Sequence, residues 1–188
     1  MTRRAAAALV AVPLLTLALA ACGPSIIDQT RASVADSVER AQDDLWPYRA
    51  DLATDPETTI AELGIFTDAR NGAPAPADGF YAQYELINLT TTSDESRITM
   101  LSAGGATTGG GWTYDQRDAA TCYTLIFPVA GDRIDTEAAD CGDIPRLAKY
   151  DEVIDFDELD VRREVTVADH PAPICQCTSG GSCDCPGG

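Results

Sequence analysis

Basic side chains are scarce in this 188-residue chain, which carries 13 Lys and Arg against 30 Asp and Glu. The formal net charge is −17 at pH 7, and it moves to −19 if the first 21 residues are removed, because they contain two arginines and no acid. A surface of this charge is repelled by nucleic acid and by anionic lipid headgroups. We therefore expect no nucleic-acid partner and no membrane attachment through basic residues.

Catalytic signatures are missing as well. The chain has a single histidine, His170, and contains no G-x-S-x-G, H-E-x-x-H or S-x-x-K motif. The glycine-rich residues 104–111 lack the Gly-Lys-Ser/Thr ending of a phosphate-binding loop, so we expect a mobile loop there. These absences favour a non-catalytic protein without a cofactor, while an enzyme that works with carboxylates alone remains a third possibility.

One long uncharged run is present, at the start of the chain. Residues 5–20 follow Arg3 and Arg4 and are almost entirely apolar. A transmembrane helix needs about 20 strongly apolar residues, and this run is shorter and rich in alanine. It is typical of the central region of a signal peptide.

The end of that run has the sequence Leu-Ala-Ala-Cys at positions 19–22, which resembles the lipobox of bacterial lipoproteins. The resemblance implies that residues 1–21 are a signal peptide and that the Cys22 thiol carries a diacylglyceryl group. Residues 22–25 would then be a lipidated tether on the extracytoplasmic face of the cell membrane, since two acyl chains give lasting attachment. The alternatives are an ordinary secretory signal with a chance cysteine, or an uncleaved anchor.

The chain has seven cysteines, and an odd number cannot pair completely into disulfides in an exported chain. Six remain for pairing if Cys22 carries lipid. Cys122 and Cys141 are separated by 18 residues, with a turn expected at Gly131-Asp132. In oxidising surroundings we expect a disulfide here, which would contribute about 3 kcal/mol through loop entropy. The arrangement resembles exported actinobacterial domains. This resemblance does not indicate any particular function.

The other four cysteines lie in a tail, residues 169–188, at C-x-C-x5-C-x-C spacing around a Gly-Gly pair. Export favours two disulfides. Four thiolates could instead hold Zn(II) or Cu(I) tetrahedrally, and His170 could replace one of them. Thiol exchange is a third reading. The cysteines concerned are Cys175, Cys177, Cys183 and Cys185.

Between tether and tail, residues 26–168 are expected to form one α+β domain of N-terminal amphipathic helices followed by a small antiparallel sheet. Ser25 is expected to cap a first helix that ends near Trp46-Pro47, and Asp55 a second that ends at Gly64. The apolar stripe of the first helix is Ile27, Val34, Val38, Ala41 and Leu45. Alternating residues predict strands at 80–86, 97–102, 120–127 and 161–167, with turns at 90–96 and 115–118.

A second group of candidate ligands is acidic. Calcium binding is conceivable, but the spacing does not fit an EF-hand loop, so a solvated acidic face is the favoured reading. The residues are Asp151, Glu152, Asp155, Asp157, Glu158 and Asp160.

Together these observations predict a lipid-anchored extracytoplasmic lipoprotein with a binding or envelope-interaction role, whose partner is an unidentified protein or small molecule. The alternative is a metal-binding surface protein that works through the cysteine tail.

Overall fold

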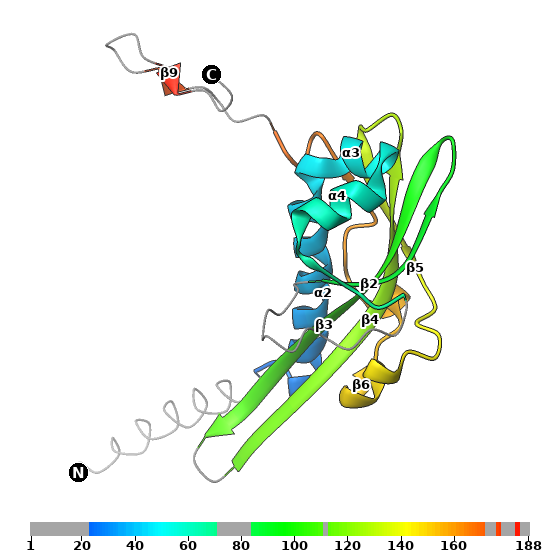
Figure 1. The fold of residues 1–188 in the computed structure, drawn as a ribbon. Coiled ribbons are helices and arrows are strands. Elements are labelled where there is room, and N and C mark those ends of the chain that lie inside the picture. Colours follow the sequence, from blue (N-terminus) through cyan, green and yellow to red (C-terminus); the bar gives the residue numbers. More distant parts are fainter. Residues whose placement is uncertain (1–22, 71–83, 111–112, 172–175, 178–182, 185–188) are drawn as a thin grey trace, which may run out of the picture.

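The fold was analysed in a computed structural model that describes residues 23–70, 84–110, 113–171, 176–177 and 183–184 (Figure 1). Cys22, Trp112, Cys175 and Cys185 lie outside the described residues, as does the first part of the strand expected at 80–86. The helices are α2 (Ile26–Leu45), α3 (Arg49–Thr54) and α4 (Pro56–Leu63), with 3-10 turns η1 (Trp46–Tyr48), η2 (Pro145–Lys149) and η3 (Phe156–Glu158). The strands are β1 (Phe66–Asp68), β2 (Tyr84–Thr91), β3 (Glu95–Gly110), β4 (Thr113–Pro128), β5 (Arg133–Ala138), β6 (Glu152–Val153), β7 (Glu164–Thr166), β8 (Gln176–Cys177) and β9 (Cys183–Asp184).

Helix α2 is the central helix, and its start is fixed locally. The Ser25 hydroxyl accepts a hydrogen bond from the Asp28 amide, and the Asp28 carboxylate accepts one from the Ser25 amide, which is a capping box. One face of α2 packs on the sheet through Val34, Val38, Ala41 and Leu45. The expected stripe is wrong at its first member, because Ile27 is 42% exposed while the polar Thr30 and Gln42 are buried.

The short helix α4 is bounded by side-chain and backbone signals. The Asp55 carboxylate accepts from the Thr58 amide, Pro56 occupies the first turn, and Gly64 adopts the left-handed conformation that ends the helix. Helix α3, between α2 and α4, was not expected from the sequence. Among the described helices, none is both long and apolar enough to cross a membrane.

The sheet makes the domain α+β, but it is neither small nor purely antiparallel. Seven strands pair in the order β1-β2-β3-β4-β5-β7, and β6 lies beside β4. The β1–β2 and β4–β6 pairs are parallel and the other pairs are antiparallel. Parallel pairing requires a crossover of a dozen or more residues. The segments 69–83 and 129–151 connect these parallel pairs, and each is long enough for such a crossover. Their lengths alone did not predict parallel strands.

Strands β3 and β4 form one long hairpin, paired from Glu95 opposite Pro128 to Gly110 opposite Thr113. The expected mobile loop at 104–111 and turn at 115–118 are therefore wrong over the described residues. Gly104 allows β3 to pack closely against α2. A Cβ atom at this position would lie 2.5 Å from the Ser33 carbonyl carbon and the Val34 nitrogen of α2. A glycine in a strand often marks such a close backbone approach.

Each face of the sheet is covered differently (Figure 1). On the α2 face, the helix packs on an apolar core that includes Met100, Tyr123 and Phe127. On the opposite face, Leu101, Ala120 and Cys122 form a smaller cluster beneath residues 139–150. The strand expected at 161–167 is shorter, since only Glu164–Thr166 pair with β5, and β5 itself was not predicted.

Candidate functional site

The segment that leads to the cysteine tail is fixed to the C-terminal end of α2. The imidazole of His170 stacks on the indole of Trp46, with ring centroids 4.9 Å apart and an interplanar angle of 14°. The His170 Nε2 lies 3.3 Å from an Asp43 carboxylate oxygen. Trp46 is only 7% exposed, because the Arg49 guanidinium also lies over its ring, 4.1 Å from the centroid. We call Asp43, Trp46, Arg162 and His170 the His170 clasp.

Arg162 joins the clasp through both its side chain and its backbone. Its Nη2 donates to the same Asp43 oxygen at 2.9 Å, and its Nε lies 3.4 Å from a Glu39 carboxylate oxygen. Its carbonyl accepts from the Gln42 Nε2 at 2.8 Å, and that Nε2 also donates to the Thr136 hydroxyl at 2.7 Å. Gln42 is fully buried, so this amide ties the end of the chain to the core.

A tight turn sets the direction in which the chain reaches His170. The Asp169 carboxylate accepts from the amide of Thr166 at 2.7 Å and from its hydroxyl at 3.0 Å. Those two hydrogen bonds hold the pKa of Asp169 below its ordinary value, since they favour the charged carboxylate. Asp169 therefore stabilises the turn in its ionised form.

The clasp and the tether lie at opposite ends of the molecule. Gly23 precedes the first turn of α2, and Trp46 follows its last turn. A 20-residue helix is about 30 Å long. The tail thus leaves the domain about 30 Å from the point where the tether enters it, as the two ends of α2 in Figure 1 show.

The described contacts of His170 are the indole ring of Trp46 and the carboxylate of Asp43. They include no hydroxyl or thiol that the imidazole could activate as a nucleophile. Two buried phenols lie elsewhere in the core. Burial raises the pKa of Tyr84, and its hydrogen bond to Asp44 (2.6 Å) adds to this; burial also raises the pKa of Tyr123, which bonds to Ser102 (2.8 Å). Both phenols stay protonated, and Tyr84 donates its proton to the Asp44 carboxylate.

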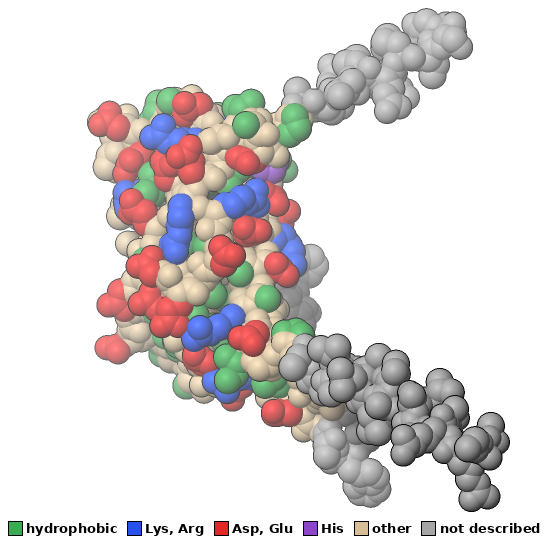
Figure 2. All heavy atoms as spheres, turned by 180° about the vertical axis from the view of Figure 1, so that it is seen from behind, with side chains coloured by type: hydrophobic (Ala, Val, Ile, Leu, Met, Phe, Trp, Pro, Cys, Tyr) green, Lys and Arg blue, Asp and Glu red, His purple; other side chains and the backbone are tan. Residues whose placement is uncertain are grey.

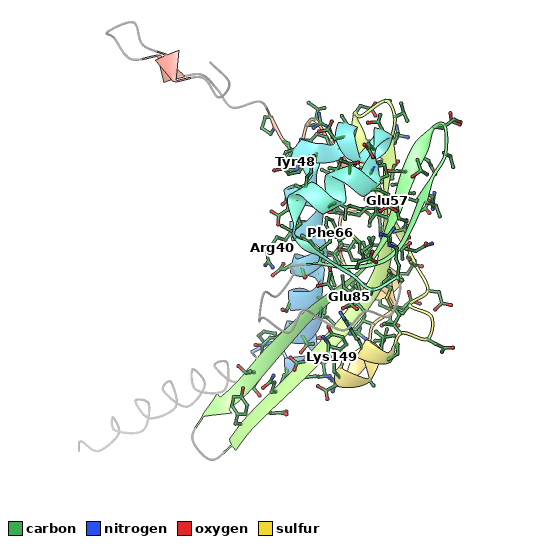
Figure 3. All side chains as sticks on the ribbon, viewed as in Figure 1. Arg40, Tyr48, Glu57, Phe66, Glu85 and Lys149 are labelled. Carbon is green, nitrogen blue, oxygen red and sulfur yellow. A yellow bond between two sulfur atoms is a disulfide. The ribbon has the colours of Figure 1, made fainter. Side chains whose placement is uncertain are left out.

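The predicted disulfide is present. Cys122 and Cys141 are bonded, with Cα atoms 5.3 Å apart, and Cys122 is buried. The bond fixes β4 to the chain that returns beneath the second face of the sheet, beside an open groove of about 480 Å³ whose lining includes Asp140 and Val153. On the same face Glu85, labelled in Figure 3 above Lys149, lies 3.2 Å from the Arg146 guanidinium. This face is held by covalent and ionic contacts.

The acidic residues within 151–160 are exposed except for the half-buried Glu152, as the solvated-face reading expects, and several of them also pair within the domain. Glu152 lies 2.7 Å from Arg117 and 3.7 Å from Arg31, and Glu158 lies 2.8 Å from Arg31. The Asp155 carboxylate caps η3. Over the part of the chain that the structure describes, no three His, Cys, Asp or Glu side chains lie close enough to hold a metal ion. The cluster is an exposed acidic surface in which Glu152, Asp157 and Glu158 form ion pairs.

The tail is described only at two short strands. β8 and β9 pair antiparallel, with Cys177 opposite Cys183. Cys175 and Cys185 lie outside the described residues, so the choice between disulfides and a Zn(II) or Cu(I) site stays a prediction. His170, which is one of the proposed ligands, lies next to the Asp43 carboxylate and stacks on the Trp46 ring.

Sequence reasoning missed the partners of the clasp. Trp46 was read only as the residue before a helix-ending proline, and Gln42 was not noticed although it is four residues after Val38, on the buried face. A polar residue inside an apolar stripe is a usable signal for a buried contact. Comparison with family models, curated proteins and solved structures gave no match to this chain.

Proposed function

We propose that this protein is a lipid-anchored bacterial lipoprotein of the extracytoplasmic membrane face, and that it is a non-catalytic binding protein. Its role would be to present the cysteine-rich tail to a protein or small-molecule partner away from the lipid surface. The observation that carries the proposal is the placement of the tether at one end of α2 and of the His170 clasp at the other.

The tether supports attachment close to the membrane. Only Gly23 and Pro24 separate the proposed lipidated Cys22 from the Ser25 cap of α2. The Pro24 carbonyl also accepts a hydrogen bond from the Gln29 side chain at 2.9 Å. Because this connection is short and tied to the helix, the start of α2 would lie next to the headgroups.

The surface charge supports lipid, and not basic residues, as the means of attachment. Figure 2 shows acidic side chains spread over the visible face of the domain, with arginines interspersed among them. Several of these arginines pair with neighbouring acids, as Arg31 does with Glu158. Such a mixed acidic surface offers no basic patch for anionic lipid on that face.

Attachment is tested by detergent phase partition and mass spectrometry of the full-length protein expressed in a bacterium that lipidates exported proteins. We expect the parent to enter the detergent phase with a diacylglyceryl mass at Cys22, and Cys22→Ser to stay in the aqueous phase. Cys185→Ser is the matched control and should partition like the parent. A mature chain that still begins at Met1, or an unmodified Cys22 thiol, would refute the anchor.

The alternative function is metal binding by the tail. It is favoured by the register that sets Cys177 opposite Cys183, one cysteine from each C-x-C pair. Native mass spectrometry separates the alternatives: each disulfide removes two protons from the mass, whereas a site retains thiols and adds the mass of Zn(II) or Cu(I). An enzyme is the third candidate, and its test is whether His170→Ala abolishes any hydrolytic activity that the parent shows.

A further inference from the structure

Strands β3 and β4 continue beyond the core as a two-stranded extension. We call residues 106–110 and 113–117 the hairpin arm. Strand β2 pairs with β3 only as far as Leu101, and β6 pairs with β4 only at Ala119 and Ala120. Among the described strands, none therefore pairs with the outer edge of the arm on either side, and only Arg117 at its base has contacts there, with Thr30 and Glu152. Natural proteins usually cover or charge such edges, so this one calls for an explanation.

The arm points toward the end of the molecule that carries the tether. At the far end of β3, the Ser96 hydroxyl donates to the Leu52 carbonyl of α3. Nine residues later, the Gly105 amide donates to the Ser33 hydroxyl near the start of α2, at 3.2 Å. Strand β3 thus runs toward the first turn of α2.

The arm is long enough to reach that end. Five further residues bring β3 from Gly105 to Gly110, about 16 Å in a strand. From Ser33 back to Ile26, α2 covers about 10 Å. The tip of the arm consequently lies level with the start of α2 or beyond it, and Figure 1 shows the two at the same end.

The chemistry of this end differs from that of the rest of the chain. Residues 98–114 contain no charged side chain, although the whole chain has a net charge of −17, and the charges of the arm, Asp115 and Arg117, lie nearer its base. Tyr114 on the arm is 65% exposed, and Ile27 at the start of α2 is 42% exposed. Tyrosine is enriched where a protein meets the headgroup layer of a membrane.

We infer that the hairpin arm is a second membrane contact, lying in the headgroup layer of the membrane that holds the lipid. This inference rests on the proposed lipid anchor. The open edges cannot enter the hydrocarbon, where their N–H and C=O groups would find no partner. Headgroups and interfacial water can satisfy them. An anchor and an arm side by side would restrict the tilt of α2 and keep the clasp end away from the lipid.

Hydrogen exchange with the full-length lipoprotein in phosphatidylcholine vesicles tests this contact. We expect amides of the arm to exchange severalfold more slowly than in Cys22→Ser mixed with the same vesicles. The turn at residues 92–94, at the opposite end of β3, should exchange alike in both. Tyr114→Asp should remove the protection while the protein still floats with vesicles. Val129→Asp, at a 47% exposed apolar residue beside that turn, is the matched control and should leave the protection unchanged.

The outcomes are distinguishable. Vesicle-bound protein whose arm exchanges as fast as in Cys22→Ser overturns the contact but leaves the anchor intact. Protein that does not float with vesicles overturns the proposed anchor. Protection that appears without vesicles and grows with protein concentration would mean that a second copy of the chain pairs with the arm, which also overturns the inference.

Discussion

Replacing Gly104 by alanine tests the close approach of the long hairpin to α2. The added Cβ atom would lie 2.5 Å from both the Ser33 carbonyl carbon and the Val34 nitrogen. These are backbone atoms of a helix, so they cannot rotate away, and the strand has to move. At the neighbouring Gly105, a Cβ atom would instead meet first the carboxylate of Asp118, a side chain that can turn aside.

The expected cost follows from these contacts. Forcing an extra methyl into a packed position costs about 1–3 kcal/mol. Replacing glycine by alanine also reduces the entropy of the unfolded chain, which returns about 0.4–1 kcal/mol. We therefore expect Gly104→Ala to lower the free energy of unfolding by about 1–2 kcal/mol and Gly105→Ala to change it by less than about 1 kcal/mol.

Urea unfolding followed by circular dichroism measures the difference, with both substitutions made in the soluble Cys22→Ser protein. Equal slopes with a lower midpoint for Gly104→Ala would show a loss of stability without a change in the unfolded state. The reasoning is refuted if Gly104→Ala is as stable as its parent, or if the two alanine variants lose the same amount.

Further predictions concern the disulfide, the buried amide and the turn before the clasp. Replacing Cys122 and Cys141 together by alanine should cost about 3 kcal/mol of stability by loop entropy, and an unchanged urea midpoint would contradict this. Gln42→Leu leaves two buried acceptors without their donor, so it should cost about 1–3 kcal/mol; a variant that unfolds at the parent's midpoint would show that the amide is dispensable. Because the folded pKa of Asp169 is lowered, its contribution is present above the ordinary value of 3.8 and is lost as the pH falls through the folded pKa. Asp169→Asn should therefore narrow the stability difference between pH 6 and pH 2, and an identical pH profile would contradict the role given to Thr166 as its donor.

The parts of the fold that local sequence determines could be read directly. Ser25 and Asp55 cap helices by hydrogen bonds that span three residues, and Gly64 ends α4 through its own backbone conformation. The disulfide was predicted from the number of cysteines and from the expectation that the chain is exported. Each of these needs only neighbouring residues or a simple count.

The parts that failed depend on contacts between distant segments. Gly104 looked like a loop residue because its reason for being glycine, the α2 backbone, lies some 70 residues earlier in the chain. Strand β5 was missed because charged residues interrupt its pattern, with only Ile134 and Thr136 buried. The clasp could not be predicted because His170 and Trp46 are far apart in the sequence and meet only through the folding of the chain between them.

The separation of the proposed tether from the clasp is tested most directly by contact quenching of Trp46 in the full-length protein bound to vesicles. The chain has two tryptophans, so Trp112→Phe leaves Trp46 as the single emitter. Because Trp46 would lie about 30 Å from the start of α2, lipids that carry a nitroxide on the headgroup should leave its emission unchanged while the protein floats with the vesicles. Strong quenching of Trp46 in the floated protein would place the clasp at the membrane and contradict the account.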